Sequence, residues 1–131
     1  MKFATPYEAL NEVWGYHNFR PLQESIIIQV LEGRNTLAVL PTGGGKSLCF
    51  QVPALCMDGV CIVITPLIAL MKDQVEQLKQ LGVKASAIYS GLSHREIDIT
   101  LDNCVLNQVK FLYVSPERLK NELFIERVKR M

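Results

Sequence analysis

Short apolar runs alternate along this chain with longer segments in which apolar residues recur at helical spacing. Residues 60–65 and 110–114 are apolar runs without regular polar alternation, which is typical of strands buried on both faces of a parallel sheet. Between residues 67 and 82, leucine, methionine and valine recur every three or four positions among charged residues. That spacing predicts an amphipathic helix, and Gly82 is a typical residue to end it.

Capping and turn residues mark the remaining elements. Thr5 and Ser93 are each followed three positions later by a glutamate, which is the pattern of a capping box at a helix start. Pro21 suits the first position of a helix, and Gly15 and Gly33 suit helix ends. We expect helices at residues 5–15, 21–33, 46–57, 93–107 and from about 121, and further strands at 35–40 and 83–89.

Strands that alternate with helices of this length predict an α/β fold, in which a parallel sheet is flanked by helices and the crossovers are right-handed. In such sheets, ligands bind at the carboxyl ends of the strands. A glycine-rich loop, Thr65 and Ser115 each follow a predicted strand. We therefore expect three candidate sites on one face of a single sheet.

The composition narrows the choice of partners. The chain has 131 residues, of which 49% are hydrophobic and 21% charged, and its formal net charge is +1, as expected of one globular domain or part of one. So small a net charge gives no general attraction to nucleic acid, and any DNA contact needs a local patch. The sequence shows no membrane span and no signal-peptide profile, so we expect a cytoplasmic protein.

The cysteines favour a core role over a metal site. Cys49, Cys56, Cys61 and Cys104 lie in apolar segments, with no C-x-x-C pair and no histidine at ligand spacing. Buried thiols of this kind behave as small apolar side chains. We expect them to be reduced, which fits an intracellular chain.

The glycine-rich loop is the strongest candidate for binding chemistry. Consecutive glycines let the backbone approach a ligand closely, and the unpaired amides at the start of the next helix attract phosphate. Lys46 supplies positive charge for the β and γ phosphates and is the candidate catalytic residue, while the Ser47 hydroxyl suits Mg²⁺. The predicted nucleotide-binding residues of this loop are Thr42, Gly43, Gly44, Gly45, Lys46 and Ser47.

The loop departs from the usual phosphate-loop pattern at one position. Leu40 stands where that pattern has its leading glycine. Glycine-rich turns before helices also occur as plain connectors, so a structural turn is the alternative. A small P-loop kinase or GTPase, or a non-catalytic nucleotide-binding module that stands alone, would also use such a loop.

Four segments in order resemble the motifs of the RecQ family of ATP-dependent DNA helicases, in helicase superfamily 2. They are residues 14–23, which resemble motif 0, 40–47 for motif I, 65–75 for motif Ia and 113–119 for motif Ib. The resemblance covers essentially the whole chain, and it implies a RecA-like motor domain that uses ATP and Mg²⁺ and binds DNA. It further implies 3′-to-5′ unwinding in DNA recombination and repair, by a protein associated with the nucleoid. Among the alternative functions, a DEAD-box RNA helicase is nearer in fold, but its glutamine motif differs from residues 19–23.

The resemblance assigns roles to residues of the first and later motifs. In motif 0, Tyr16 and Arg20 would hold adenine between a ring and a guanidinium plane, and Gln23 would hydrogen-bond the base edge. The alternative is that Gln23 caps a helix and Tyr16 belongs to the core. In motifs Ia and Ib, the DNA contacts would be Thr65, Gln74, Ser115 and Arg118. These four could equally be strand-end and solvated helix residues.

Hydrolysis of ATP also needs acidic residues at a strand end, to hold Mg²⁺ and to orient the attacking water. Neither Thr65 nor Ser115 is followed by an adjacent acidic pair. We therefore expect residues 1–131 to be the N-terminal portion of a first motor domain, without motif II, the second motor domain or the C-terminal regions. Such a piece would bind ATP and be inactive alone.

Overall fold

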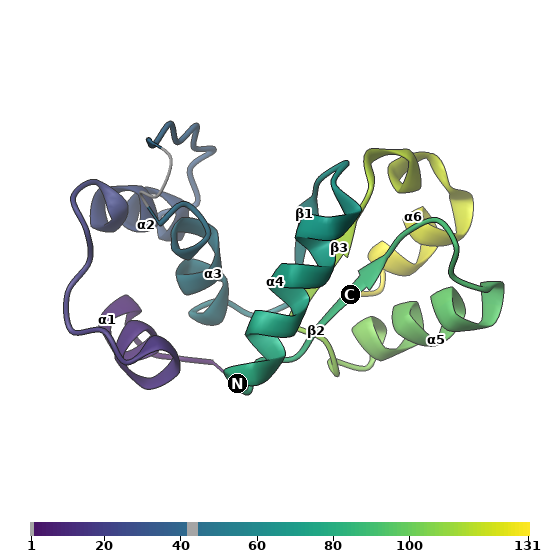
Figure 1. Ribbon diagram of the computed structural model, residues 1–131, viewed down its shortest axis with the longest axis horizontal. Coiled ribbons are helices and arrows are strands. Elements are labelled where there is room, and N and C mark those ends of the chain that lie inside the picture. Colours follow the sequence, from purple (N-terminus) through teal and green to yellow (C-terminus); the bar gives the residue numbers. More distant parts are fainter. Residues whose placement is uncertain (1, 42–44) are drawn as a thin grey trace. The chain divides into compact units, whose positions relative to one another are not determined.

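The computed structural model describes residues 2–41 and 45–131 of the chain (Figure 1). It divides into two compact units, residues 1–58 and residues 59–131. Each unit has its own packed elements, and they are described one after the other.

The first unit is helical. Its elements are α1 (Pro6–Ala9), the π-helix η1 (Leu10–Trp14), α2 (Gln23–Leu31) and α3 (Leu48–Leu55). The Thr5 hydroxyl accepts a hydrogen bond from the Glu8 amide at the start of α1, and Gly15 ends η1 in the left-handed region at φ 77°. The expected helix over 5–15 is therefore confirmed, with its second half wound as a π-helix.

Helices α1 and α2 both pack on α3. The fully buried side chains of this small core are Ala9, Leu10, Ile27, Val52 and Leu55. The Phe3 amide donates to the Leu55 carbonyl over 2.8 Å, which ties the start of the chain to the end of α3. Burial of these apolar side chains is the main force that holds the unit together.

Helix α2 begins at Gln23 and not at Pro21, so that expectation was wrong by two residues. The Gln23 amide donates to the Arg20 carbonyl over 3.2 Å and closes a turn with Pro21 and Leu22 at its centre. Leu22 has φ 73°, the value that the third position of a type II turn requires. The helix starts only after this turn because left-handed backbone cannot continue into it.

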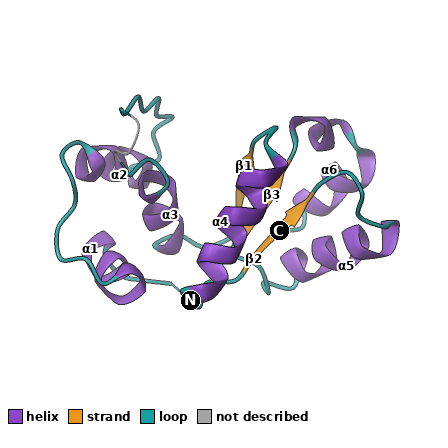
Figure 2. Cartoon of the chain, in the orientation of Figure 1, coloured by secondary structure: helices purple, strands orange, loops and turns teal. Residues whose placement is uncertain are grey.

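Residues 35–40 do not form the expected strand. They carry no strand assignment, and Figure 2 draws them as loop. Leu37 and Val39 are 91% and 82% exposed. A strand needs a neighbour for its N–H and C=O groups, and the described strands pair only with one another. An apolar run alone was therefore not enough to predict a strand. As a result, the glycine-rich loop follows no strand of the described sheet.

The second unit is built on a parallel sheet. In chain order its elements are β1 (Cys61–Ile64), α4 (Ile68–Gln80), β2 (Ala85–Ile88), α5 (His94–Val105), β3 (Phe111–Val114), the 3₁₀ helix η2 (Pro116–Lys120) and α6 (Glu122–Val128). The strand order is β1-β3-β2, and both pairings are parallel, with Tyr113 opposite Val63 and Ala87. The predicted α/β class with a parallel sheet flanked by helices is confirmed.

Strand β3 is buried on both faces. Leu112 and Val114 belong to an apolar cluster that includes Leu101 of α5 and Phe124 of α6. Side chains alternate along a strand, so Tyr113 points the other way, where its hydroxyl donates to Gln74 of α4 over 2.6 Å. Figure 1 shows α4 and α5 on opposite sides of the strands.

All four cysteines are free thiols, and burial raises the pKa of both Cys61 and Cys104 to about 11. In residues 2–41 and 45–131, no helix has both the length and the apolar character needed to cross a membrane.

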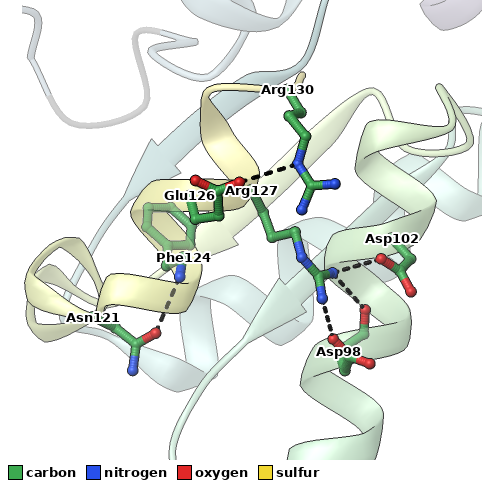
Figure 3. A network of polar contacts seen from close by, with 7 residues as sticks. All are labelled: Asp98, Asp102, Asn121, Phe124, Glu126, Arg127 and Arg130. Atoms are coloured by element: carbon green, nitrogen blue, oxygen red, sulfur yellow. Dashed lines mark hydrogen bonds and ion pairs between the residues drawn. The ribbon is translucent and has the colours of Figure 1, made fainter.

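Polar contacts fix α5 and α6 to each other (Figure 3). Ser93 and Glu96 form the predicted capping box at the start of α5. The Arg127 guanidinium of α6 lies between the carboxylates of Asp98 and Asp102 and pairs with both. The Arg127 side chain is only 14% exposed, so it also relieves the repulsion between two like charges four residues apart on α5.

We predict that Arg127→Met lowers the free energy of unfolding by about 1 to 2 kcal/mol, because charge-assisted hydrogen bonds to two half-exposed carboxylates are lost. Arg130→Met is the matched control, since Arg130 pairs only with Glu126 and both side chains are more than half exposed. Urea denaturation of both variants measures the difference. Equal losses would show that the α5–α6 network contributes nothing beyond a surface pair.

Candidate functional site

The loop between η1 and α2 carries Tyr16 and Arg20, and local contacts hold it. The Phe19 ring meets the Tyr7 ring edge-on at 4.9 Å between centroids. Asn11 and His17 form a side-chain hydrogen bond of 3.2 Å. The loop is thus attached at two points to the helices that precede it.

Tyr7 also connects α1 to α2. Its hydroxyl donates to the Glu24 carboxylate in the first turn of α2, and this hydrogen bond is the main cause of a raised Tyr7 pKa. The start of α2 is therefore positioned both by its own turn and by this contact.

Gln23 is the most buried polar residue of the candidate site, at 1% exposure. Its side-chain oxygen accepts from the Arg20 amide over 2.7 Å, and its side-chain nitrogen donates to the Gly45 carbonyl over 3.0 Å. The Arg20 Cδ lies 3.9 Å from the position that a Cβ on Gly45 would occupy. The structure thus brings together Arg20, Gln23 and Gly45, which are predicted site residues from two motifs.

Lys46 and Ser47 lead directly into α3. The Cys49 amide donates to the Lys46 carbonyl over 3.1 Å and the Gln51 amide to the Ser47 carbonyl over 3.0 Å, so both residues belong to the first helical turn. The Lys46 side chain is exposed. Amides at such a helix start are suited to an anion, and phosphate binding by Lys46 and Ser47 stays a prediction.

The structure gives less information on the other predicted nucleotide-binding residues. Tyr16 is 55% exposed, which argues against a core role but leaves its role toward a base a prediction. Thr42, Gly43 and Gly44 lie outside the described residues. The contact between Gln23 and Gly45 was missed by sequence reasoning, because nothing local signals a pairing of residues 22 positions apart.

In the second unit, a cavity of about 500 Å³ lies at the carboxyl ends of the strands. Pro66 follows β1, Ser90 follows β2 and Ser115 follows β3, which is the edge where parallel sheets bind ligands. The residues that line the cavity are Pro66, Ile68, Ser90, Ser115, Glu117, Arg118 and Asn121. Ser90 was not predicted, although it follows its strand as Ser115 follows β3.

Arg118 lines this cavity and carries one donor without a partner. Its Nε is buried and has no hydrogen-bond partner among the described residues. Buried polar atoms are nearly always hydrogen-bonded, so an orphaned donor points to an absent acceptor. Arg118 and Ser115 line one cavity, so these two predicted residues are brought together.

Thr65 and Gln74 do not line this cavity. The Thr65 hydroxyl accepts from the Leu67 amide over 3.3 Å and shapes the start of α4. The Gln74 side-chain oxygen accepts from the buried Tyr113 hydroxyl. Both side chains therefore have structural contacts, and their predicted DNA contacts remain predictions.

The Gln23–Gly45 contact predicts an unequal response to substitution of two glycines. Gly45 and Gly33 have φ 74° and 80°, so alanine at either is strained, by about 1 kcal/mol. Alanine at 45 also places Cβ 2.2 Å from the Gln23 side-chain nitrogen, whereas nothing lies within 4 Å at 33. Gly45→Ala should cost about 1 to 3 kcal/mol more than Gly33→Ala, because a buried hydrogen bond is lost. Equal urea midpoint shifts would contradict this.

Comparison with known protein families gives a match over most of the chain. The family model described as DEAD/DEAH box helicase matches residues 20–131. That range includes Arg20, Gln23 and Gly45 in the first unit, and the whole of the second.

Individual relatives confirm the resemblance to RecQ. The chain is 43% identical to "ATP-dependent DNA helicase RecQ" of Haemophilus influenzae, over 93% of the chain and 20% of that protein. It is 42% identical to "Probable ATP-dependent DNA helicase RecS" of Bacillus subtilis, over 93% of the chain and 24% of that protein. It is 47% identical to "ATP-dependent DNA helicase RecQ" of Synechocystis sp., over 88% of the chain and 24% of that protein. The chain thus spans about a fifth to a quarter of the length of these relatives. Since the family model matches most of its residues, the chain belongs to the DEAD/DEAH box helicase family.

Proposed function

We propose that this chain is the ATP-binding portion of an ATP-dependent DNA helicase that unwinds DNA with 3′-to-5′ polarity in recombination and repair. In this proposal it is the N-terminal part of the first motor domain, in a protein that works on the DNA of the nucleoid. The observation that carries it is the convergence of Arg20 and Gln23 on Gly45, directly before Lys46 and Ser47. Proteins named as ATP-dependent DNA helicases match 93% and 88% of the chain.

The triphosphate would bind at the start of α3. Amides in the first turn of a helix carry partial positive charge, and Lys46 adds a full charge beside them. A fixed cation near the β and γ phosphates stabilises the negative charge that develops as the γ-phosphoryl group leaves. Thr42, Gly43, Gly44 and Gly45 would complete the cradle, and the glycines, which have no Cβ, would let the phosphates approach the backbone.

Magnesium would enter with the nucleotide. The described residues contain no group of three or more histidine, cysteine, aspartate or glutamate side chains that could hold a metal ion. Mg²⁺ commonly keeps several waters and takes few protein ligands beside substrate phosphates. The donor set here, the Ser47 hydroxyl with phosphate oxygens, fits that mode of binding, and the ion would neutralise charge between the phosphates.

The base would lie beside the loop that precedes α2. The exposed ring of Tyr16 and the guanidinium of Arg20 offer two flat surfaces on which adenine can stack. Gln23 carries both an acceptor and donors, which suits the edge of adenine.

DNA would bind at the carboxyl edge of the sheet in the second unit. The Arg118 guanidinium would donate to a phosphate oxygen, and Arg118 and Ser115 both line the cavity. Thr65, in the loop after β1, and Gln74, in α4, would contact or support the DNA strand. Contacts of this kind position a nucleic-acid backbone without reading its sequence.

The nucleotide site predicts a large effect of Lys46→Ala. Loss of a charge-assisted contact of about 1.5 to 3 kcal/mol should weaken ATP binding by roughly 10- to 100-fold. Isothermal titration of the 131-residue chain with Mg-ATP measures this directly. Lys129→Ala, an exposed lysine that follows α6, is the control and should leave affinity unchanged. Wild-type affinity in Lys46→Ala would reject the phosphate cradle.

The DNA site predicts a salt-dependent effect of Arg118→Met. Losing one phosphate contact should weaken binding of a single-stranded oligonucleotide by about tenfold, and should lower the slope of log affinity against log salt by about 0.7. Fluorescence anisotropy over a salt series gives both values. Arg130→Met removes the same charge outside the cavity and should change neither. The proposal fails if both variants behave alike.

A further inference from the structure

We propose that the outer edge of β2 is a docking site for an extended, acidic segment of a partner protein, which pairs with β2 as a further strand of the sheet. Two cavities lie along this edge, and they share no lining residue with the proposed DNA cavity. Binding of a protein segment here is separate from ATP binding and DNA binding, so it goes beyond the proposed function.

The first support is the unpaired main chain of β2. Among the described strands, β2 pairs only with β3. The Phe111 amide of β3 donates to the Lys84 carbonyl over 3.2 Å, and main-chain groups point to alternate sides along a strand. In this register the main chain of Ser86 also faces β3, whereas that of Ala85 and Ala87 faces outward. Such outward N–H and C=O groups are able to pair with another strand.

The strand itself carries none of the usual obstacles to such pairing. Its register with β3 is continuous, without a bulge, and residues 85–88 include no proline and no charged side chain. Ser86 and Ala87 are small and partly exposed. Natural edge strands are commonly protected by bulges, prolines or charges, so the middle of β2 is an accessible edge.

The second support is the groove in which this edge lies. Cavities of about 390 and 360 Å³ are both lined by Lys79 of α4 and Ser86 of β2. Helix α5 contributes Asn103 to the first cavity and Thr100 to the second. Since α4 and α5 lie on opposite sides of the strands (Figure 1), β2 forms the bottom of a groove between two helices. Extended peptides bind to other proteins by adding a strand to an exposed sheet edge of this kind.

The third support is the charge of the groove. The only charged side chains that line the larger of these two cavities belong to Lys79 and Lys84. Lys84 donates to the neutral Gln108 oxygen over 3.3 Å, and neither lysine forms an ion pair with a described residue. Two uncompensated ammonium groups favour a carboxylate-bearing ligand.

The smaller cavity favours a peptide over a nucleic acid. Glu76 and Glu96 line it together with Lys72 and Lys79. A phosphate backbone that followed the groove would meet two carboxylates, whereas a peptide can place a carboxylate beside a lysine and a neutral residue elsewhere. A phosphodiester backbone also has no N–H group to donate to the outward carbonyls of β2.

A fluorescein-labelled peptide of alternating glutamate and valine, about eight residues long so that it spans the strand, tests the proposal. We expect it to bind the 131-residue chain in fluorescence anisotropy, and a peptide of alternating lysine and valine not to bind. Lys79→Glu should weaken binding by about tenfold, because an attraction becomes a repulsion. Lys129→Glu, at an exposed position after α6, makes the same charge change outside the groove and should bind like wild type.

The main-chain pairing has its own test. Ala87→Pro removes an outward N–H and leaves the bonds to β3 in place, as prolines in edge strands do. It should also weaken binding by about tenfold, provided that its circular dichroism matches that of wild type. In the wild-type chain, bound peptide should slow hydrogen exchange of the Ala87 amide by about tenfold, as measured by NMR. That readout does not depend on any variant.

Three results would overturn the proposal. The first is that the glutamate peptide does not bind, or binds without protecting the Ala87 amide. The second is that a single-stranded oligonucleotide displaces the labelled peptide and protects the same amide, which would make the groove a nucleic-acid site. The third is that the Ala87 amide is already protected in the free chain and loses this protection on dilution, which would make a second copy of the chain the occupant.

Discussion

One buried amide side chain determines how the candidate nucleotide site is arranged. Gln23 lies at the first position of α2 and reaches the Gly45 carbonyl at the entrance to α3. Packing of apolar side chains is not directional, whereas the hydrogen bond from Gln23 to the Gly45 carbonyl specifies one distance and one direction between these segments. The convergence of the two segments that are predicted to bind adenine and phosphate depends on that contact.

In the second unit, polar groups lie at the end of a buried sheet. Strand β3 is central and fully buried, and the strands on either side are parallel to it. Their carboxyl ends therefore meet at one edge, where Ser115 and Arg118 line a common cavity. These two residues are held together locally, because the Arg118 amide donates to the Ser115 carbonyl over 3.1 Å at the start of η2.

Features that depend on residues close together in the sequence could be predicted, whereas contacts between distant segments could not. The capping box at Ser93 and the helix end at Gly15 were read correctly because each depends on neighbours a few residues away. The strand over 35–40 was wrong, since a strand requires a partner that composition does not reveal. Likewise the Gln23–Gly45 contact and the orphaned Nε of Arg118 depend on how distant segments fold together.

The Tyr113–Gln74 hydrogen bond makes two positions on different elements interdependent. Tyr113 is fully buried and donates a hydrogen bond from its hydroxyl to the Gln74 oxygen, so a phenylalanine at 113 would remove that hydrogen bond. Among homologous sequences, the identities of these two positions should then covary. If position 74 covaries with position 113, the role of residue 74 is to support the sheet. If Gln74 is constant whatever residue stands at 113, it is selected for a ligand instead.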